Sequence, residues 1–238
     1  SQNEICYISV GGVKLMAEVI KVIGKNAFVQ VFESTRGMRV GDEAEFEGHM
    51  LEVTLGPGML SRNYDGLQND LDKMEGVFLR RGEYTFPLDN DKLWDFKPLA
   101  KVGDKVAAGG WLGEVDENFQ PHKIMVPFTF KGEYTVKSLK EAGQYTIGEV
   151  IAVLTDETGK DVEVTMIQRW PVKRAITCYK EKPRPYKLLE TGVRTIDTVN
   201  PIVEGGTGFI PGPFGTGKTV LQHAISKQAE ADIVIIAA

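Results

Sequence analysis

The chain of 238 residues has few cysteines, no long apolar run and no excess of positive charge, and each shortage excludes a class of protein. Cys6 and Cys178 are the two cysteines and lie far apart, which excludes a disulfide framework and favours free thiols in a reducing compartment. No segment approaches the roughly 20 apolar residues that a membrane-spanning helix needs, and no signal-peptide pattern opens the sequence. These shortages indicate a cytoplasmic protein without direct membrane insertion.

The charge balance bears on possible partners. The 28 basic and 33 acidic residues give a formal net charge of −5, and the basic residues are scattered except over residues 180–187. Nucleic acid is therefore not an expected partner. The length allows one to three domains, on a prior of about 150 residues per domain.

A glycine-rich stretch near the end of the sequence matches a phosphate-binding loop at each specified position. The pattern is G-x-x-x-x-G-K-[ST], and the residues are Gly212, Pro213, Phe214, Gly215, Thr216, Gly217, Lys218 and Thr219. Its glycines allow successive backbone N–H groups to turn toward phosphate oxygens. The Lys218 ammonium would reach the β- and γ-phosphates, and the Thr219 hydroxyl is a hard oxygen donor suited to Mg²⁺. The pattern predicts nucleotide binding by these eight residues and Val220, with Lys218 catalytic and Thr219 a metal ligand.

The sequence on both sides supports this prediction. Residues 208–210 are a short apolar run suited to a buried strand, and apolar residues recur at helical spacing from Val220 to Ile225. Residues 233–238 are continuously apolar, which is typical of a buried parallel strand. A strand, a loop, a helix and a second strand are therefore expected, and this context disfavours a chance glycine-rich turn.

The segment leading to the loop contains two further expected elements. Residues 180–187 are charged and carry prolines at 183 and 185, which indicates an extended connector. Residues 188–197 are expected to form a short helix with Thr191 as its N-cap.

The remainder of the chain is predicted to be rich in β-structure, so the fold class is mixed β and α/β. Residues 1–48 have short alternating strands and turn signals typical of a small antiparallel β-barrel. Residues 49–90 are interpreted as a connector, 91–165 as an inserted β-rich domain resembling a barrel-sandwich, and 166–238 as the beginning of a nucleotide-binding domain. Small barrels also bind oligonucleotides, but this region has too few aromatic and basic residues to favour oligonucleotide binding.

The inserted domain contains an internal repeat. Residues 102–115 resemble residues 143–154 in the order of their glycine, acidic and apolar positions, which suggests a sandwich of paired hairpins. This pattern is also similar to biotinyl and lipoyl carrier domains. The nearest candidate for a modified lysine is Lys123, but it lacks the flanking methionines of those carriers, so a docking or spacer role is favoured.

Four motifs together resemble one family, the catalytic A subunits of the V/A-type rotary ATPases. The motifs are T-L-G-P-G-M-L at 54–60 with Y-D-G-L-Q at 64–68, M-I-Q-R-W-P-V at 166–172, T-G-V-R-T-I-D-T at 191–198, and I-P-G-P-F-G-T-G-K-T at 210–219. The insert at 91–165 is similar to the bulge that distinguishes these A subunits from related subunits. Thr216 is a mild departure, since serine or another small residue is expected there.

The resemblance implies ATP hydrolysis or synthesis coupled to H⁺ or Na⁺ transport, with ATP or ADP and Mg²⁺ as cofactors. It implies an alternating hexamer with non-catalytic B subunits, contacts with a central and a peripheral stalk and with a membrane ion-translocating sector, and a peripheral location on the cytoplasmic face. Phe214 would shape the loop near the nucleotide. The catalytic glutamate, the Walker B aspartate and the C-terminal helical domain of that family have no counterpart in these residues, so we expect a fragment that is inactive alone.

Two alternatives remain at this point. Another hexameric ATPase that combines a barrel with a phosphate loop, such as a secretion ATPase or a helicase, is disfavoured by the insert. A non-catalytic assembly module is the second alternative, in which the barrel joins a crown of neighbouring subunits and the bulge docks a peripheral stalk.

Overall fold

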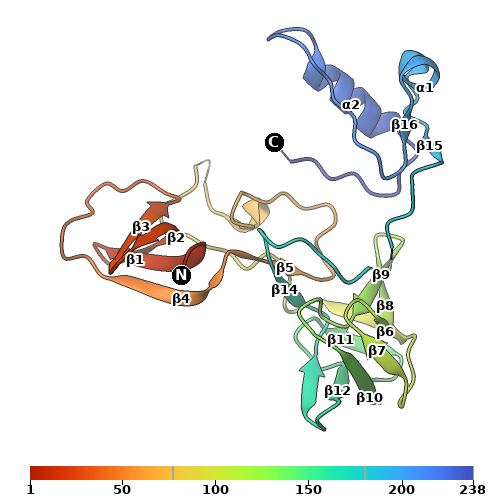
Figure 1. Ribbon diagram of the computed structural model, residues 1–238, viewed down its shortest axis with the longest axis horizontal. Coiled ribbons are helices and arrows are strands. Elements are labelled where there is room, and N and C mark those ends of the chain that lie inside the picture. The colour runs from red at the N-terminus through yellow and green to blue at the C-terminus, as the bar shows by residue number, and fades with distance from the viewer. Residues whose placement is uncertain (77, 180, 238) are drawn as a thin grey trace. The chain divides into compact units, whose positions relative to one another are not determined.

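The computed structural model describes residues 1–76, 78–179 and 181–237 (Figure 1). The chain divides after Cys178 into two compact units, which are described separately. None of the helices in these ranges combines the length and the apolarity that crossing a bilayer requires.

The first unit begins with a four-stranded antiparallel sheet in the order β3-β2-β1-β4. Its strands are β1 (Glu4–Val10), β2 (Val13–Ile23), β3 (Asn26–Val31) and β4 (Ala44–Met50). Side chains that alternate along β1 and β2 point to one face, as the period of two along a strand requires. They form a small buried core of Cys6, Ile8, Val10, Leu15 and Ala17. The expected antiparallel β-structure at the N-terminus is confirmed.

A connecting region follows this sheet. Strand β5 (Glu52–Leu55) pairs in antiparallel fashion with β14 (Gln168–Pro171), which lies more than a hundred residues later. A single turn of 3₁₀ helix, η1 (Leu71–Lys73), lies between β5 and the next sheet strand. The β5–β14 pair brings together the two ends of the segment that contains the inserted domain.

The inserted domain is a sandwich of two four-stranded antiparallel sheets (Figure 1). Its strands are β6 (Leu93–Pro98), β7 (Lys105–Ala107), β8 (Trp111–Glu117), β9 (Gln120–Met125), β10 (Glu133–Leu139), β11 (Gly143–Thr146), β12 (Ala152–Asp156) and β13 (Asp161–Val164). One sheet has the order β13-β12-β10-β7 and the other β9-β8-β6-β11.

The order of the two sheets confirms the internal repeat. Strands β6 to β9 and β10 to β13 are successive repeats, and each sheet takes three strands from one repeat and the second strand of the other. This exchange of β7 and β11 interlocks the repeats. The domain has two buried hydrophobic cores. One is built around Trp94, Phe96 and Ile124, and the other around Leu112, Val136 and Leu154. Each of these side chains is at most 4% exposed.

The second unit contains fewer regular elements. They are β15 (Leu188–Leu189), α1 (Arg194–Val199), β16 (Ile202–Val203) and α2 (Lys218–Gln228). Strands β15 and β16 pair in antiparallel fashion, and the helix expected after the phosphate loop is present as α2.

Two strands expected in this unit do not form. Residues 208–210 are not a strand, nor are residues 233–237, and Ala238 lies outside the described residues. A strand exists only by pairing with a neighbour, and in the described part of this unit no segment pairs with either run. Phe209 and Ile235 are consequently 86% and 89% exposed.

The expected helix over 188–197 is also placed differently. Its first residues pair with β16, and α1 begins only after Val193, which has an extended backbone and makes no side-chain cap. Thr191 is therefore not an N-cap. Its hydroxyl instead donates to Asp197 Oδ1 at 2.6 Å, and Thr191 is the one fully buried residue among those described in this unit.

Candidate phosphate-binding site

The predicted phosphate loop is an exposed turn that leads directly into α2. Gly215 and Gly217 both have left-handed backbones, with φ of 81° and 82°, which side chains other than that of glycine adopt at a cost. A Cβ on Gly212 would lie 2.6 Å from Thr216 Oγ1. The Thr216 side chain therefore lies against Gly212, and its hydroxyl donates to the Pro213 carbonyl at 2.8 Å.

Lys218 is the first residue of α2 and folds back over the loop. Its Nζ donates to the carbonyl oxygens of Gly212 at 2.7 Å and Pro213 at 2.6 Å. The ammonium group therefore lies at the loop, held by polar atoms and not by apolar packing. A polyanion in the loop would attract the same ammonium group, because hydrogen bonds between ionised partners are strong.

The start of α2 supplies further donors. Leu221 N donates the first bond of the helix, to Gly217 O at 3.0 Å. The N–H groups of the residues before Leu221 lack partners within the helix, as at any helix N-terminus, and the helix dipole adds partial positive charge there. Free amides, a positive helix end and an ammonium group thus meet at one turn, and this combination fits a polyphosphate.

The other predicted site residues differ in exposure. Phe214 is fully exposed and Val220 is 73% exposed, so neither contributes to a closed pocket in the described residues. Thr219 is exposed on the first turn of α2, where its hydroxyl is accessible. The described residues contain no cluster of three or more His, Cys, Asp or Glu side chains that would hold a metal alone. A Mg²⁺ ion at Thr219 would take further oxygen ligands, such as phosphate oxygens and water, as this ion often does.

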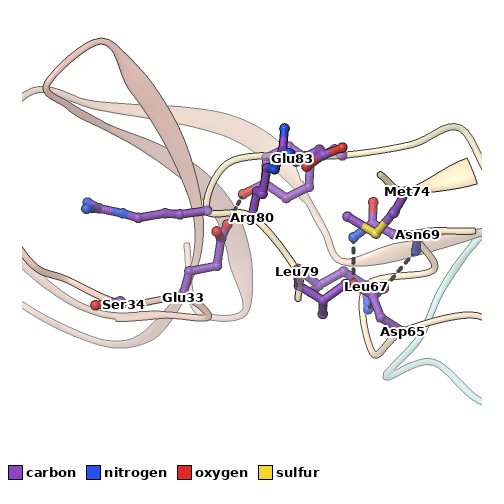
Figure 2. Close-up of a pocket in the computed structure, with 11 residues that line it drawn as sticks. Glu33, Ser34, Asp65, Leu67, Asn69, Met74, Leu79, Arg80 and Glu83 are labelled. Atoms are coloured by element: carbon purple, nitrogen blue, oxygen red, sulfur yellow. Dashed lines mark hydrogen bonds between the residues drawn. The ribbon is translucent and has the colours of Figure 1, made fainter. Parts of the chain in front are cut away.

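A cavity of about 260 Å³ lies elsewhere, in the first unit, beside β3 and the segment 65–84 (Figure 2). Two of its acidic side chains, Glu33 and Asp65, accept hydrogen bonds from elsewhere in the chain. Glu33 accepts the Tyr84 hydroxyl at 2.5 Å and the Gly82 N–H at 2.6 Å. Burial, and then the bond to Glu33, raise the pKa of the Tyr84 phenol. The hydrogen bonds of Glu33 therefore connect residues 82–84 to the chain that follows β3 of the N-terminal sheet.

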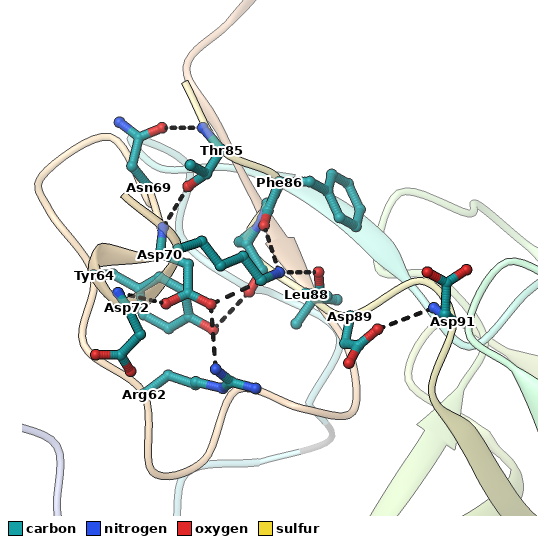
Figure 3. A network of polar contacts seen from close by, with 12 residues as sticks. Arg62, Tyr64, Asn69, Asp70, Asp72, Thr85, Phe86, Leu88, Asp89 and Asp91 are labelled. Carbon is teal, nitrogen blue, oxygen red and sulfur yellow. Dashed lines mark hydrogen bonds and ion pairs between the residues drawn. The ribbon is translucent and has the colours of Figure 1, made fainter. Parts of the chain in front are cut away.

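A network around Asp70 has a similar structural role (Figure 3). The fully buried Asp70 carboxylate lies 3.5 Å from Arg62 Nη1 and 3.7 Å from Lys73 Nζ. Lys73 also donates to the carbonyls of Leu88 at 2.6 Å and Phe86 at 3.1 Å. A buried carboxylate needs such partners, since an unpaired buried charge is strongly unfavourable. These contacts tie residues 62–73 to residues 86–88.

A second buried carboxylate, Glu117, holds the tip of the β8–β9 hairpin. It accepts the N–H groups of Gly58 at 2.7 Å and Leu60 at 2.9 Å, and pairs with His122 Nδ1 at 2.7 Å. Burial alone would raise the pKa of this carboxyl, but the bonds from His122, Leu60 and Gly58 outweigh it and leave the pKa lowered. Glu117 thereby fastens the inserted domain to the loop after β5.

Lys123 is within β9 and not at the tip of a hairpin. Its Nζ is in an ion pair with Glu114 and lies 5.0 Å from the centre of the Trp111 ring. A lysine held in this way on the face of a sheet is not displayed for modification, in agreement with the sequence-based preference against a carrier domain.

Three protein-family descriptions match the chain in succession. They are the beta-barrel domain of the ATP synthase alpha/beta family over residues 1–48, the ATP synthase alpha/beta subunit barrel-sandwich domain over 85–173, and the nucleotide-binding domain of the ATP synthase alpha/beta family over 192–238. The phosphate loop lies within the third match. The chain therefore carries domains of the ATP synthase alpha/beta family, and the expected fold class is confirmed.

Curated relatives narrow the class further. The chain is 51% identical to the V-type ATP synthase alpha chain of Treponema denticola over 99% of its residues, and 48% identical to alpha chain 1 of Treponema pallidum over 100%. It is 49% identical to the V-type ATP synthase alpha chain of Borrelia garinii subsp. bavariensis, also over 100%. The matches span 41%, 41% and 42% of those proteins. Over its whole length the chain is a homologue of V-type ATP synthase alpha chains, as the sequence motifs indicated.

Proposed function

We propose that the chain forms the N-terminal part of a catalytic subunit that hydrolyses or synthesises ATP in a V/A-type rotary complex. The observation that supports this most directly is the phosphate loop, in which Lys218 lies against the loop carbonyls and α2 begins with free amides. Gly212, Pro213, Phe214, Gly215, Thr216, Gly217, Lys218, Thr219 and Val220 are the proposed nucleotide-binding residues. When ATP is bound, Lys218 neutralises charge on the β- and γ-phosphates, and such electrostatic stabilisation is the main catalytic contribution to phosphoryl transfer.

Mg²⁺ is the proposed metal, with the Thr219 hydroxyl as its protein ligand. The exposed position of Thr219 beside Lys218 supports this assignment, because Mg²⁺ prefers oxygen ligands and shares them with phosphate. When bound, the ion would supply charge neutralisation for the phosphates.

The proposed partners follow from the resemblance. They are non-catalytic B subunits in an alternating hexamer, a central and a peripheral stalk, and a membrane sector that moves H⁺ or Na⁺, with the subunit on the cytoplasmic face. Domain boundaries at 48, 90 and 165 are proposed on the same basis. Because the chain spans about 41% of its relatives, we expect turnover to require residues beyond these 238, so the test measures binding.

Isothermal titration with MgATP tests the site. The chain should bind MgATP, and Lys218→Ala should weaken binding about 10- to 100-fold, since a hydrogen bond to a charged group contributes about 1.5–3 kcal/mol. Lys227→Ala is the matched control, because Lys227 is an exposed lysine in the last turn of the same helix. Thr219→Ala should reduce the gain in ADP affinity that Mg²⁺ produces.

Two outcomes of this titration would contradict the proposal, and they have different meanings. Equal binding by Lys218→Ala and Lys227→Ala would mean that the loop is not the nucleotide site. No binding by the unmodified chain would leave the assembly-module alternative as the better account of these residues.

A further inference from the structure

One short segment, residues 187–192, contacts the chain on both sides of the phosphate loop. On the near side, β15 pairs with β16, and Glu204 N donates to Lys187 O at 2.9 Å. From β16 the chain reaches the loop at Gly212 after residues 204–211, which form no helix or strand. The segment is therefore bonded to the chain shortly before the loop.

The same segment also contacts the far end of α2. Glu230 N donates to Glu190 O at 3.0 Å, just after the last residue of the helix. Gly192 lies against Gln228, because a Cβ on Gly192 would be 3.0 Å from both Gln228 Cβ and Gln228 Oε1. The 11 residues of α2 span about 16 Å, so a contact at this end limits where the first turn of the helix can lie.

These two contacts close a ring. The chain leaves the segment at β15, returns through β16, passes through the phosphate loop and α2, and meets the segment again at Glu190 and Gly192. None of the residues of α2 is buried, so the contact at its end supplies anchoring that a hydrophobic face does not supply in the described residues.

The shape of the segment is set by Asp197. Its Oδ1 accepts the N–H and the hydroxyl of Thr191, at 3.0 Å and 2.6 Å, and its Oδ2 accepts the Gly192 N–H at 3.1 Å. Thr191 Oγ1 in turn accepts the Val193 N–H at 3.2 Å. Gly192 has a φ of +74°, where a side chain is strained. The turn at 191–192 is thus held by several bonds in a conformation that needs glycine.

We propose that the Thr191–Gly192 turn, fastened by Asp197, is a positioning clasp that holds the phosphate loop in its binding geometry through β16 and α2. This inference rests on the proposed function, since it assigns a role toward the same phosphate site. Thr191, Gly192 and Asp197 are positioning residues that do not touch the nucleotide.

Two substitutions open the clasp in different ways. Thr191→Val keeps the shape of the side chain but removes its hydroxyl, and Gly192→Ala places a Cβ against Gln228 in a strained backbone. Thr191→Ser retains the hydroxyl and is the matched control. MgATP affinity is measured by titration, and amide hydrogen exchange is followed at Glu230 and over residues 212–219, with and without MgATP.

We expect Thr191→Val and Gly192→Ala to weaken MgATP binding about 10-fold, the size of effect seen for residues that couple to a distant site. In the ligand-free protein, exchange should be faster both at Glu230 and in the loop. Thr191→Ser should match the unmodified chain in both measurements.

Two results overturn the clasp. One is faster exchange at Glu230 with loop exchange and MgATP affinity unchanged, and the other is unchanged exchange at Glu230 in both variants. If the unmodified chain binds no MgATP, the proposed function fails, while loop exchange in the ligand-free variants still decides whether the clasp exists.

Discussion

The inserted sandwich and the region after Cys178 both contain apolar runs, but these runs form buried strands only in the sandwich. Both contain runs of β-branched and aromatic residues. In the sandwich, eight strands pair within two interlocked sheets and bury Phe96 and Leu154 almost completely. In the region after Cys178, Phe209 and Ile236 are 86% and 67% exposed. The difference shows that an apolar run becomes a strand only where another strand is available to pair with it.

The carboxylates that hold loops in the two regions differ in the same way. Glu117 is 2% exposed and Asp197 is partly exposed, although both accept backbone N–H groups from a turn. The region with complete sheets thus buries the carboxylate that anchors a loop. In the region with unpaired apolar runs, the carboxylate that holds the turn at 191–192 stays partly exposed.

The largest expected effect that tests this comparison comes from a matched pair of phenylalanines. Phe96→Ala should lower the free energy of unfolding by about 3–5 kcal/mol, because it removes a buried ring and leaves a cavity. Phe209→Ala should change it by less than about 0.5 kcal/mol, as is usual at exposed positions. Urea unfolding followed by far-ultraviolet circular dichroism measures both, and similar losses from the two variants would contradict the assigned burial.

A smaller loss of stability is expected from substitutions of the two carboxylates, Glu117 and Asp197. Glu117→Gln should destabilise the first unit by about 1–3 kcal/mol, since it weakens hydrogen bonds to a buried charged group. Asp197→Asn should have a smaller effect on global stability, because its carboxylate is partly solvated. A loss from Asp197→Asn that equals or exceeds that from Glu117→Gln would reverse the comparison.

The pH dependence of the free energy of unfolding gives a further test of the role of Glu117. The folded state lowers the pKa of Glu117, so its stabilisation is complete above the usual carboxyl pKa of about 4.3 and is lost as the pH falls through the lower folded value. The difference in stability between the unmodified chain and Glu117→Gln should therefore narrow as the pH falls from 6 to about 3. A difference that stays constant over this range would show that the charge of Glu117 does not contribute.

Much of the fold was predictable because its signals are local. Alternation along β1 and β2 and the repeated glycines of the inserted domain indicated the antiparallel sheets, and the loop pattern indicated the start of α2. The exchange of β7 and β11 between the sheets was not predictable, since it depends on pairing between strands distant in sequence.

The errors arise where contacts within the fold override the local sequence preference. Residues 208–210 and 233–237 have the composition of buried strands, but pairing and not composition decides whether a strand forms. Thr191 is a residue type that caps helices, yet its hydroxyl contacts Asp197 and the helix begins later. The roles of Glu117 and Asp70 had no sequence signal, because their partners are brought together only by the fold.

The proposed site requires that the amides and the ammonium group at 212–219 receive the phosphates of a nucleotide. The most direct test is a two-dimensional amide NMR titration of the ¹⁵N-labelled chain with MgATP. The largest shifts are expected at Gly215, Gly217, Lys218 and Thr219, and they should disappear in Lys218→Ala. Shifts confined to residues outside this loop, or the same shifts in Lys218→Ala, would contradict the claim.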